Sequence, residues 1–304
     1  MQSKPSKRIL DQFSAHVKSD SVFSANARLL QSLWRDANGY PFEKYGNQFL
    51  VDFAKSSKAN YLTPTIAKLV EEEVNNAGDR VISEPRIWNN LLSSQPLAFN
   101  LFGELKLEPG FKTMQGVLNE LYPGRSAQVT SLEFEYSPSR KSEKYTNDRS
   151  AFDVFIEYLN PEGEKCFFGV EVKYSENMND APARVRDEYG QVALEMGIFK
   201  PECFDELKNT SIQQLWRDHL LAGSMFIKNQ DYDRGDFIIL YPQDNTNCVR
   251  SIEKYQKTFN TDDNYFIPLT IERFHTALSK VSNEKWVSDF YDRYLDFEKL
   301  KELG

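Results

Sequence analysis

The sequence has few cysteines and histidines and no long apolar run, which are the features that mark disulfide-rich, zinc-binding and membrane proteins. It contains three cysteines and three histidines among 304 residues, and no two cysteines have a CxxC spacing. This composition argues against a disulfide framework and against the common zinc sites. No run of eighteen apolar residues occurs, and the basic first twenty residues lack the apolar stretch of a signal peptide. We therefore expect a protein without a membrane span, in a reducing, cytoplasmic compartment.

The sequence also lacks the motifs of several common enzyme classes. The sequence has no GxSxG motif, no P-loop and no glycine-rich dinucleotide turn after a strand. Positive charge is also in deficit, because the formal net charge is −8. Proteins that hold nucleic acid by neutralising phosphates alone are usually basic. An acidic chain of this kind would need a local basic patch, bound metal ions or a partner protein to bind nucleic acid.

The chain does have enough apolar residues for a hydrophobic core, and its helix and strand patterns follow a clear order. Hydrophobic residues make up 40% and aromatic residues 13% of the sequence, which argues against disorder. Residues 20–76 have apolar side chains at helical spacing, with Thr63 as a helix cap. We expect three parts that pack as one compact unit: a helical extension over 1–84, a core over 85–245, and a mostly helical extension over 246–304.

The core reads as helices, then three strands, then a helix and a further strand. Helical patterns cover 97–107 and 111–122, strand patterns cover 128–137, 151–159 and 165–175, and a helix over 211–228 precedes a strand over 236–241. The stretch "YFIPLTIERF" fits either another strand or the start of a helix. This order predicts an α/β (α+β) protein with a mixed central sheet covered by helices.

Two opposite charges interrupt the apolar strand "CFFGVEVKYSE". Glu171 and Lys173 are two residues apart, so they point to the same face of a strand. The loop "NPEGE" predicts a hairpin in which Leu159 faces Lys165, which places Asp153 opposite Glu171. A slip of one residue would send the pair to opposite faces. Two carboxylates this close repel each other unless a proton or a cation lies between them.

A divalent cation accounts for this combination. Mg²⁺ binds through one or two carboxylates and takes its remaining ligands from water and substrate phosphate. Such an ion polarises a phosphoryl oxygen and lowers the pKa of a bound water, and a lysine can orient that water or stabilise the developing charge. The arrangement of Asp153, Glu171 and Lys173 therefore favours hydrolysis of a phosphodiester. The alternative is a buried ion pair with a purely structural role.

These residues carry a resemblance to a known family. Asp153, followed after seventeen residues by Glu171-Val172-Lys173 on a hairpin after a helix, resembles the PD-(D/E)XK nuclease superfamily, which has a restriction-endonuclease-like αβββαβ core. The stretches "FNLFGEL", "SAFD", "GVEVKY" and "LWRDHLLA" are similar to those of a bacterial group within it. The sequence departs from the family pattern before Asp153, where alanine and phenylalanine stand and proline is frequent.

The resemblance implies roles for further residues. Glu104 would help Asp153 and Glu171 to hold the metal, although a glutamate on a helix surface is nearly as good an interpretation. Gln214 and Arg217 lie three residues apart on one helix face and would point at the site or at a phosphate, or else are surface or capping residues. Arg184 and Arg186, just after the hairpin, would contact a nucleic-acid backbone unless they are solvated.

The resemblance also implies an activity. We expect a Mg²⁺- or Mn²⁺-dependent nuclease that acts on DNA rather than RNA, in restriction, phage defence or repair, with a homodimer or a protein partner as an option. Two alternatives stay open. One is a nuclease fold that has lost catalysis and serves as a binding module, and the other is a phosphohydrolase acting on a small nucleotide.

Overall fold

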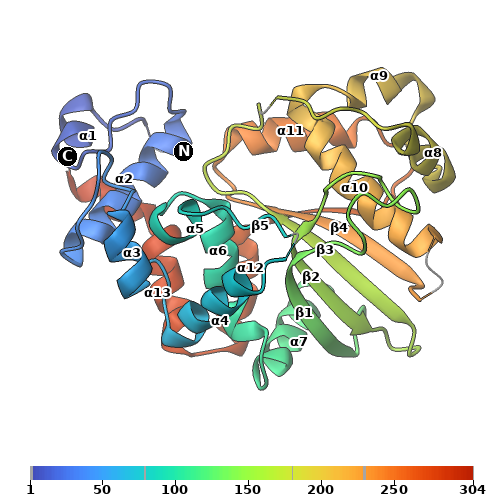
Figure 1. Ribbon diagram of the computed structural model, residues 1–304, viewed down its shortest axis with the longest axis horizontal. Helices are drawn as coiled ribbons and strands as arrows, with labels where there is room; N and C mark the ends of the chain where they lie inside the picture. The colour runs from blue at the N-terminus through green and yellow to red at the C-terminus, as the bar shows by residue number, and fades with distance from the viewer. Residues whose placement is uncertain (1–2, 79, 180, 229–230, 304) are drawn as a thin grey trace.

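The computed structural model describes residues 3–78, 80–179, 181–228 and 231–303. Its centre is a five-stranded sheet in the order β1-β2-β3-β4-β5 (Figure 1). The strands are β1 (Gln128–Tyr136), β2 (Phe152–Leu159), β3 (Lys165–Val172), β4 (Arg234–Tyr241) and β5 (Phe266–Thr270). The pairs β1–β2 and β2–β3 are antiparallel, whereas the pairs β3–β4 and β4–β5 are parallel.

Helices precede, separate and follow these strands. Before β1 come α1 (Lys7–Gln12), α2 (Val22–Ala37), α3 (Val51–Ser57), α4 (Pro64–Asn75), α5 (Arg86–Asn89), α6 (Ser94–Phe102), the 3-10 turn η1 (Gly103–Leu105) and α7 (Gly110–Leu121). Between β3 and β4 lie α8 (Asp187–Met196), η2 (Pro201–Cys203), α9 (Phe204–Leu207) and α10 (Thr210–Lys228). α11 (Thr246–Gln256) joins β4 to β5, and α12 (Ile271–Val281), α13 (Lys285–Tyr294) and η3 (Phe297–Leu303) end the described chain.

This order confirms the predicted fold class. A helix, three antiparallel strands, the long helix α10 and a parallel strand give the αβββαβ core with a mixed sheet. The hairpin also has the predicted register, because Leu159 faces Lys165 and Val154 faces Val170. Both interpretations of "YFIPLTIERF" are correct in part, since β5 runs directly into α12.

The alternation of side chains along the strands builds two cores, one on each face of the sheet. On one face Ile156, Val170 and Leu240 pack with side chains of the helical part, including α6, α7 and α12. On the other face Phe155, Phe167 and Ile239 pack with α8, α10 and α11. Asp153 and Glu171 alternate in phase with Phe155 and Phe167, so the second face carries the candidate site.

The N-terminal and C-terminal helices pack together beside the sheet (Figure 1). Arg293 of α13 is fully buried between them and donates hydrogen bonds to Asn60 and to Gln31 of α2. The division of the chain at residues 84 and 245 stays a prediction. Within the described residues, no helix is both long and apolar enough to span a membrane.

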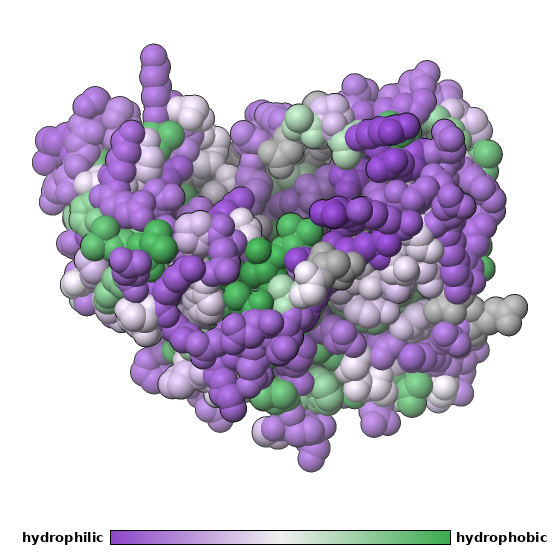
Figure 2. Space-filling view, viewed as in Figure 1, coloured by the Kyte–Doolittle hydropathy of each residue, from purple (hydrophilic) through white to green (hydrophobic). Residues whose placement is uncertain are grey.

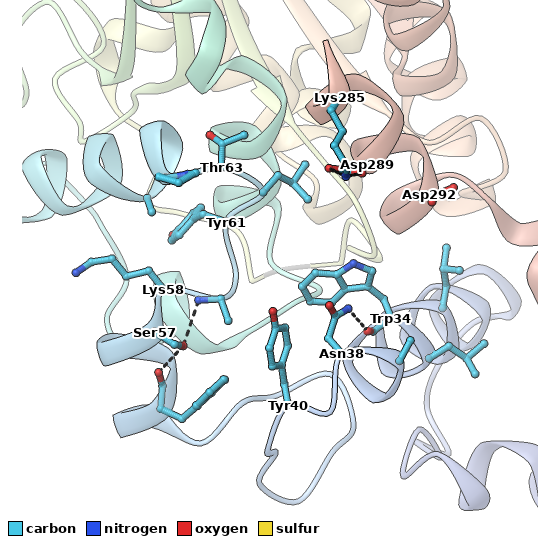
Figure 3. A pocket seen from close by; sticks show the side chains of 18 of the residues that line it. Trp34, Asn38, Tyr40, Ser57, Lys58, Tyr61, Thr63, Lys285, Asp289 and Asp292 are labelled. Atoms are coloured by element: carbon cyan, nitrogen blue, oxygen red, sulfur yellow. Dashed lines mark hydrogen bonds and ion pairs between the residues drawn. The ribbon is translucent and has the colours of Figure 1, made fainter. Parts of the chain in front are cut away.

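Figure 2 shows a mostly hydrophilic face that is hollowed at the top, between the N-terminal helices on one side and the α8–α11 part on the other. A cavity of about 1120 Å³ lies elsewhere, among the terminal helices, and Figure 3 shows Trp34, Tyr40 and Tyr61 around it. Its lysines are paired with acids, as in the contacts Lys58–Glu71 and Lys285–Asp289. None of the predicted site residues lines this cavity.

Candidate active site

Asp153 and Glu171 lie on neighbouring strands where β2 begins and β3 ends. The hairpin register pairs Val154 with Val170, and its continuation by one residue places Asp153 opposite Glu171. The Asp153 carboxylate also accepts a hydrogen bond from the backbone N–H of Val172, with 2.7 Å between Oδ2 and N. Because this bond ties the side chain to the residue between Glu171 and Lys173, the backbone fixes Asp153 beside both of them.

Glu171, Lys173 and Gln214 form a closed polar triangle. The Lys173 Nζ lies 2.6 Å from Glu171 Oε1 and donates to Gln214 Oε1 at 3.0 Å. The Gln214 amide in turn donates to Glu171 Oε1 at 2.7 Å. Glu171 and Lys173 are only 7% and 6% exposed. α10 therefore supplies the residue that makes two buried charges tolerable in an otherwise apolar strand.

A third carboxylate, Glu135, comes from β1 and was not predicted from the sequence. The pairs Phe134–Val154 and Tyr136–Phe152 on either side place Glu135 level with Asp153. Its backbone has a positive φ of 51°, and its buried carboxylate accepts a hydrogen bond from Gln95 of α6. An acidic residue near the end of the strand before "SAFD" was the available signal. Without the β1–β2 register, however, it could not be assigned to the site.

Asp218 is a second residue that the sequence did not single out for the site. It lies one helical turn after Gln214 on α10, so the two share a face. It is 3% exposed, and its Oδ2 atom has no hydrogen-bond partner among the described residues. A buried carboxylate oxygen without a partner is costly in a purely structural element and is typical of a site that binds something.

Arg217 lies beside this cluster and fixes the loop that leads into β2. Its guanidinium donates to Asp148 Oδ2 at 3.2 Å and to Ser150 Oγ at 3.0 Å. Asp148 also accepts hydrogen bonds from the Tyr189 hydroxyl and the Ser150 backbone. Burial would raise the pKa of Asp148, but these hydrogen bonds and the Arg217 charge keep it below its ordinary value. Arg217 thus holds the segment that precedes Asp153.

Arg184 and Arg186 precede α8, in a segment attached to α10. Gln213, the neighbour of Gln214, exchanges hydrogen bonds of 2.6 and 2.9 Å with the backbone of Ala183. Arg184 is exposed, while Arg186 is half-buried at the N-cap of α8. Their contact with a nucleic acid stays a prediction.

Glu104 lies in η1, where its carboxylate accepts a hydrogen bond from the Thr63 hydroxyl. Thr63 is the N-cap of α4 and lines the cavity of Figure 3. Among the described residues, Glu104 has no hydrogen bond to Asp153, Glu171 or Lys173. Its role as a metal ligand stays a prediction, and Glu135 occupies the position level with Asp153.

The comparisons with known proteins give a family match over most of the chain. The sequence model of the PD-(D/E)XK nuclease superfamily matches residues 18–296. The chain belongs to this superfamily. Searches of curated proteins and of solved structures find no match. The match includes the helices on both sides of the sheet, so these helices are part of what the family model describes.

The electrostatics of the site fit the divalent metal ions that PD-(D/E)XK nucleases generally use. Burial, followed by the charges of Glu171 and Glu135, raises the pKa of Asp153 well above its ordinary value. Burial and the Glu171 charge also raise the pKa of Glu135, to about 7. Burial would lower the pKa of Lys173, but Glu171 and Glu176 raise it. Three carboxylates around one ammonium leave an excess of negative charge.

The donor set fits such an ion in type and in number. No three acidic, histidine or cysteine side chains of the described residues lie close enough together to complete a metal site alone. Mg²⁺ does not require three, because it is bound through one or two carboxylates and keeps several waters. Asp153 and Glu171 would supply these two carboxylates, with Glu135 and Asp218 as neighbouring acids.

Proposed function

We propose that this PD-(D/E)XK protein is a Mg²⁺- or Mn²⁺-dependent nuclease that hydrolyses phosphodiester bonds of DNA. The observation that carries the proposal is the convergence of Asp153, Glu171 and Lys173 at the point where the start of β2 lies beside the end of β3. A structural ion pair needs only Glu171 and Lys173. The addition of Asp153 and Glu135 creates repulsion that costs stability unless a cation relieves it.

Each residue has a chemical task in this proposal. Asp153 and Glu171 hold the metal, which when bound polarises the phosphoryl oxygen and lowers the pKa of a water. Lys173 orients the attacking water or stabilises the negative charge that develops on the phosphoryl group. Gln214 is a positioning residue, because it holds both Glu171 and Lys173 through its amide. Arg217 positions the loop before Asp153.

Binding of DNA by a chain of net charge −8 needs local positive charge. Arg184 and Arg186 supply it in the proposal, since Gln213 attaches their segment to the helix that carries Gln214. The preference for DNA and a role in restriction, phage defence or repair rest on the resemblance of the sequence motifs to a bacterial group of the superfamily. A cytoplasmic location agrees with the three free cysteines.

The first experiment is a cleavage assay with plasmid, linear duplex and single-stranded DNA, RNA, and free nucleotides, in Mg²⁺, Mn²⁺ or EDTA. It compares the unaltered protein with Asp153→Asn and Lys173→Met. Asp205→Asn is the matched control, because Asp205 is exposed on α9 and pairs with the neighbouring Lys208. Circular dichroism establishes that all variants fold.

We expect cleavage of DNA that requires metal and falls at least about 100-fold in both site variants, but not in the control. Cleavage that survives Asp153→Asn or Lys173→Met would refute the assigned site. Release of phosphate from nucleotides alone would favour a small-molecule phosphohydrolase. Mn²⁺ binding without any cleavage would favour a catalytically silent module.

A further inference from the structure

A polar cavity of about 430 Å³ lies directly beyond the catalytic strand. One side is formed by Ser175, Glu176 and Asn177, which follow Lys173 in the chain. The other side comes from the N-terminal helical part, and its lining includes Arg28, Tyr45, Asn47, Gln48, Arg86 and Asn90. Ser175 is two residues from Lys173, at most about 7 Å along the chain. The cavity therefore begins within two residues of the proposed reaction centre along the chain.

Part of this lining is already fixed by internal contacts. Arg28 is held by Asp20 through distances of 2.7 and 3.0 Å and donates to Asn47 Oδ1 at 2.7 Å. Asn47 in turn donates to Asn90 Oδ1 at 3.2 Å. These bonds join α2, the loop after it and the residue after α5 into a rigid wall. Because Asp20 neutralises Arg28, we assign this arginine a structural role in the cavity wall rather than a role in binding a ligand.

Three other side chains of the lining have polar groups available to a ligand, whereas Ser175, Glu176 and Asn177 are hydrogen-bonded within the fold. Among the described residues, the Arg86 guanidinium and the Gln48 side-chain amide have no hydrogen bond or ion pair. The amide nitrogen of Asn90 likewise has no acceptor there, since only its oxygen is used. The half-buried ring of Tyr45 lies beside them, with the Arg28 guanidinium 5.7 Å and the Lys44 ammonium 5.2 Å from its centroid. Among its described residues, the cavity thus presents one unpaired cation, Arg86, one acid, Glu176, whose carboxylate accepts from the Tyr174 N–H, amide donors and acceptors, and an aromatic ring.

We propose that this cavity binds one nucleotide of a single-stranded stretch of the substrate, with Arg86 on a phosphate, Gln48 and Asn90 on the base edge and Tyr45 against the base. The proposal rests on the proposed function and adds to it a substrate form. Arginine recognises phosphate, amide side chains recognise base edges, and aromatic rings stack on unpaired bases. A base paired inside a duplex cannot enter a cavity, so the strand must be single at this point.

The test is fluorescence anisotropy with a labelled single-stranded DNA and the matching blunt duplex. Ca²⁺ replaces Mg²⁺, and gels establish that the DNA stays intact. Arg86→Gln removes one cation at an exposed position. Lys112→Gln is the matched control, because Lys112 is exposed on α7 and, in the described chain, also without an ion pair. Gln48→Ala is measured on normal single strands and on strands with abasic positions.

We expect Arg86→Gln to weaken binding of the single strand and to make the slope of log affinity against log salt shallower by about 0.7. Lys112→Gln leaves both unchanged. Gln48→Ala weakens binding of normal single strands about fivefold but does not alter binding of abasic strands or of the duplex.

If the unaltered protein binds the single strand and both cavity variants bind it equally well, the cavity is not a nucleotide site, while the proposed nuclease activity is untouched. Failure of the unaltered protein to bind any single strand would also overturn the cavity proposal. The cleavage assay described above decides separately whether the protein is a nuclease. Weaker binding by Arg86→Gln in a protein that does not cleave would support the cavity and refute the catalysis.

Discussion

Two buried charge clusters lie at opposite ends of the β3–β4 pair, and they differ in how their charges balance. At one end Asp236, 1% exposed, contacts the guanidinium groups of Arg125 and Arg234. At the other end Lys173 pairs with Glu171, while Glu135 and Asp153 have no ion pair among the described residues and only the more distant Arg140 and Arg80 act on Glu135. The first cluster has no deficit of positive charge, whereas the second has one.

This difference in charge balance is the one expected between a structural cluster and a functional one. A buried carboxylate with two arginine partners is satisfied within the fold, and removing one partner leaves a costly unpaired charge. A group of carboxylates with raised pKa values is strained until a proton or a metal ion is added. The strain at Asp153 therefore argues for a bound cation, which the Asp236 cluster does not need.

The largest expected contrast is between Asp236→Asn and Asp153→Asn. Asp236→Asn removes the negative charge between Arg125 and Arg234 and should lower the free energy of unfolding by about 2–4 kcal/mol, because both arginines are partly exposed. Asp153→Asn keeps an oxygen for the Val172 N–H but removes a repelling charge. It should leave the stability unchanged within about 1 kcal/mol or raise it.

Urea unfolding without metal, followed by circular dichroism, measures this contrast. Cleavage of DNA should show the reverse order, with activity retained in Asp236→Asn at temperatures where it is folded. Equal loss of stability in the two variants would mean that Asp153 belongs to a structural network, and the comparison would fail.

Two glycines, one near each charge cluster, allow the same comparison with a smaller expected effect. A Cβ on Gly169 of β3 would lie 2.5 Å from the ring of Phe152, which directly precedes Asp153. A Cβ on Gly235 of β4, beside Asp236, would lie 2.0 Å from the ring of Phe167. We expect each alanine substitution to cost about 1–3 kcal/mol through overpacking.

The two alanine variants should differ in activity rather than in stability. Gly169→Ala displaces Phe152 and with it the carboxylate of Asp153, so cleavage should fall even at temperatures where the variant is folded. Gly235→Ala disturbs the structural end and should retain cleavage. Thermal melts and cleavage rates check both, and full activity in Gly169→Ala would show that Phe152 does not position the site.

The sequence predicts the hairpin and the Asp153–Glu171 pair at its open end, because both follow from local spacing. The five-residue loop is closed by a bond from the Asn160 N–H to the Glu164 carbonyl, so loop length alone sets which residues face each other. From the sequence, Gln214 and Arg217 had the same two interpretations, either pointing at the site or at a phosphate, or lying on the surface as capping residues. The contacts of Gln214 with Glu171 and of Arg217 with Asp148 come from the packing of α10 and from the folded loop.

The carboxylates of Glu135 and Asp218 depend on non-local geometry. β1 and β2 are joined by a long connection, residues 137–151, which does not fix their register. The positive φ of Glu135 also breaks the simple alternation along β1, where Glu133 is exposed and Glu135 buried. Asp218 has the spacing of a surface helix residue, and only the packing of α10 on the sheet turns it towards Glu171.

The smallest expected effect is the pH dependence of metal binding, and it follows from the same excess of carboxylates. Without metal, Glu135 has a pKa of about 7 and Asp153 one well above its ordinary value, so both carry protons at mildly acidic pH. The folded state then binds more protons than the unfolded state between about pH 4 and 7, and stability falls as the pH rises through 7.

Mn²⁺ requires the deprotonated carboxylates, so its apparent affinity should increase up to about tenfold per pH unit for each displaced proton. Calorimetric titration with Mn²⁺ at pH 6, 7 and 8 measures this slope, and Glu135→Gln should reduce it while Asp236→Asn should not. An affinity independent of pH would mean that the metal does not bind among these carboxylates.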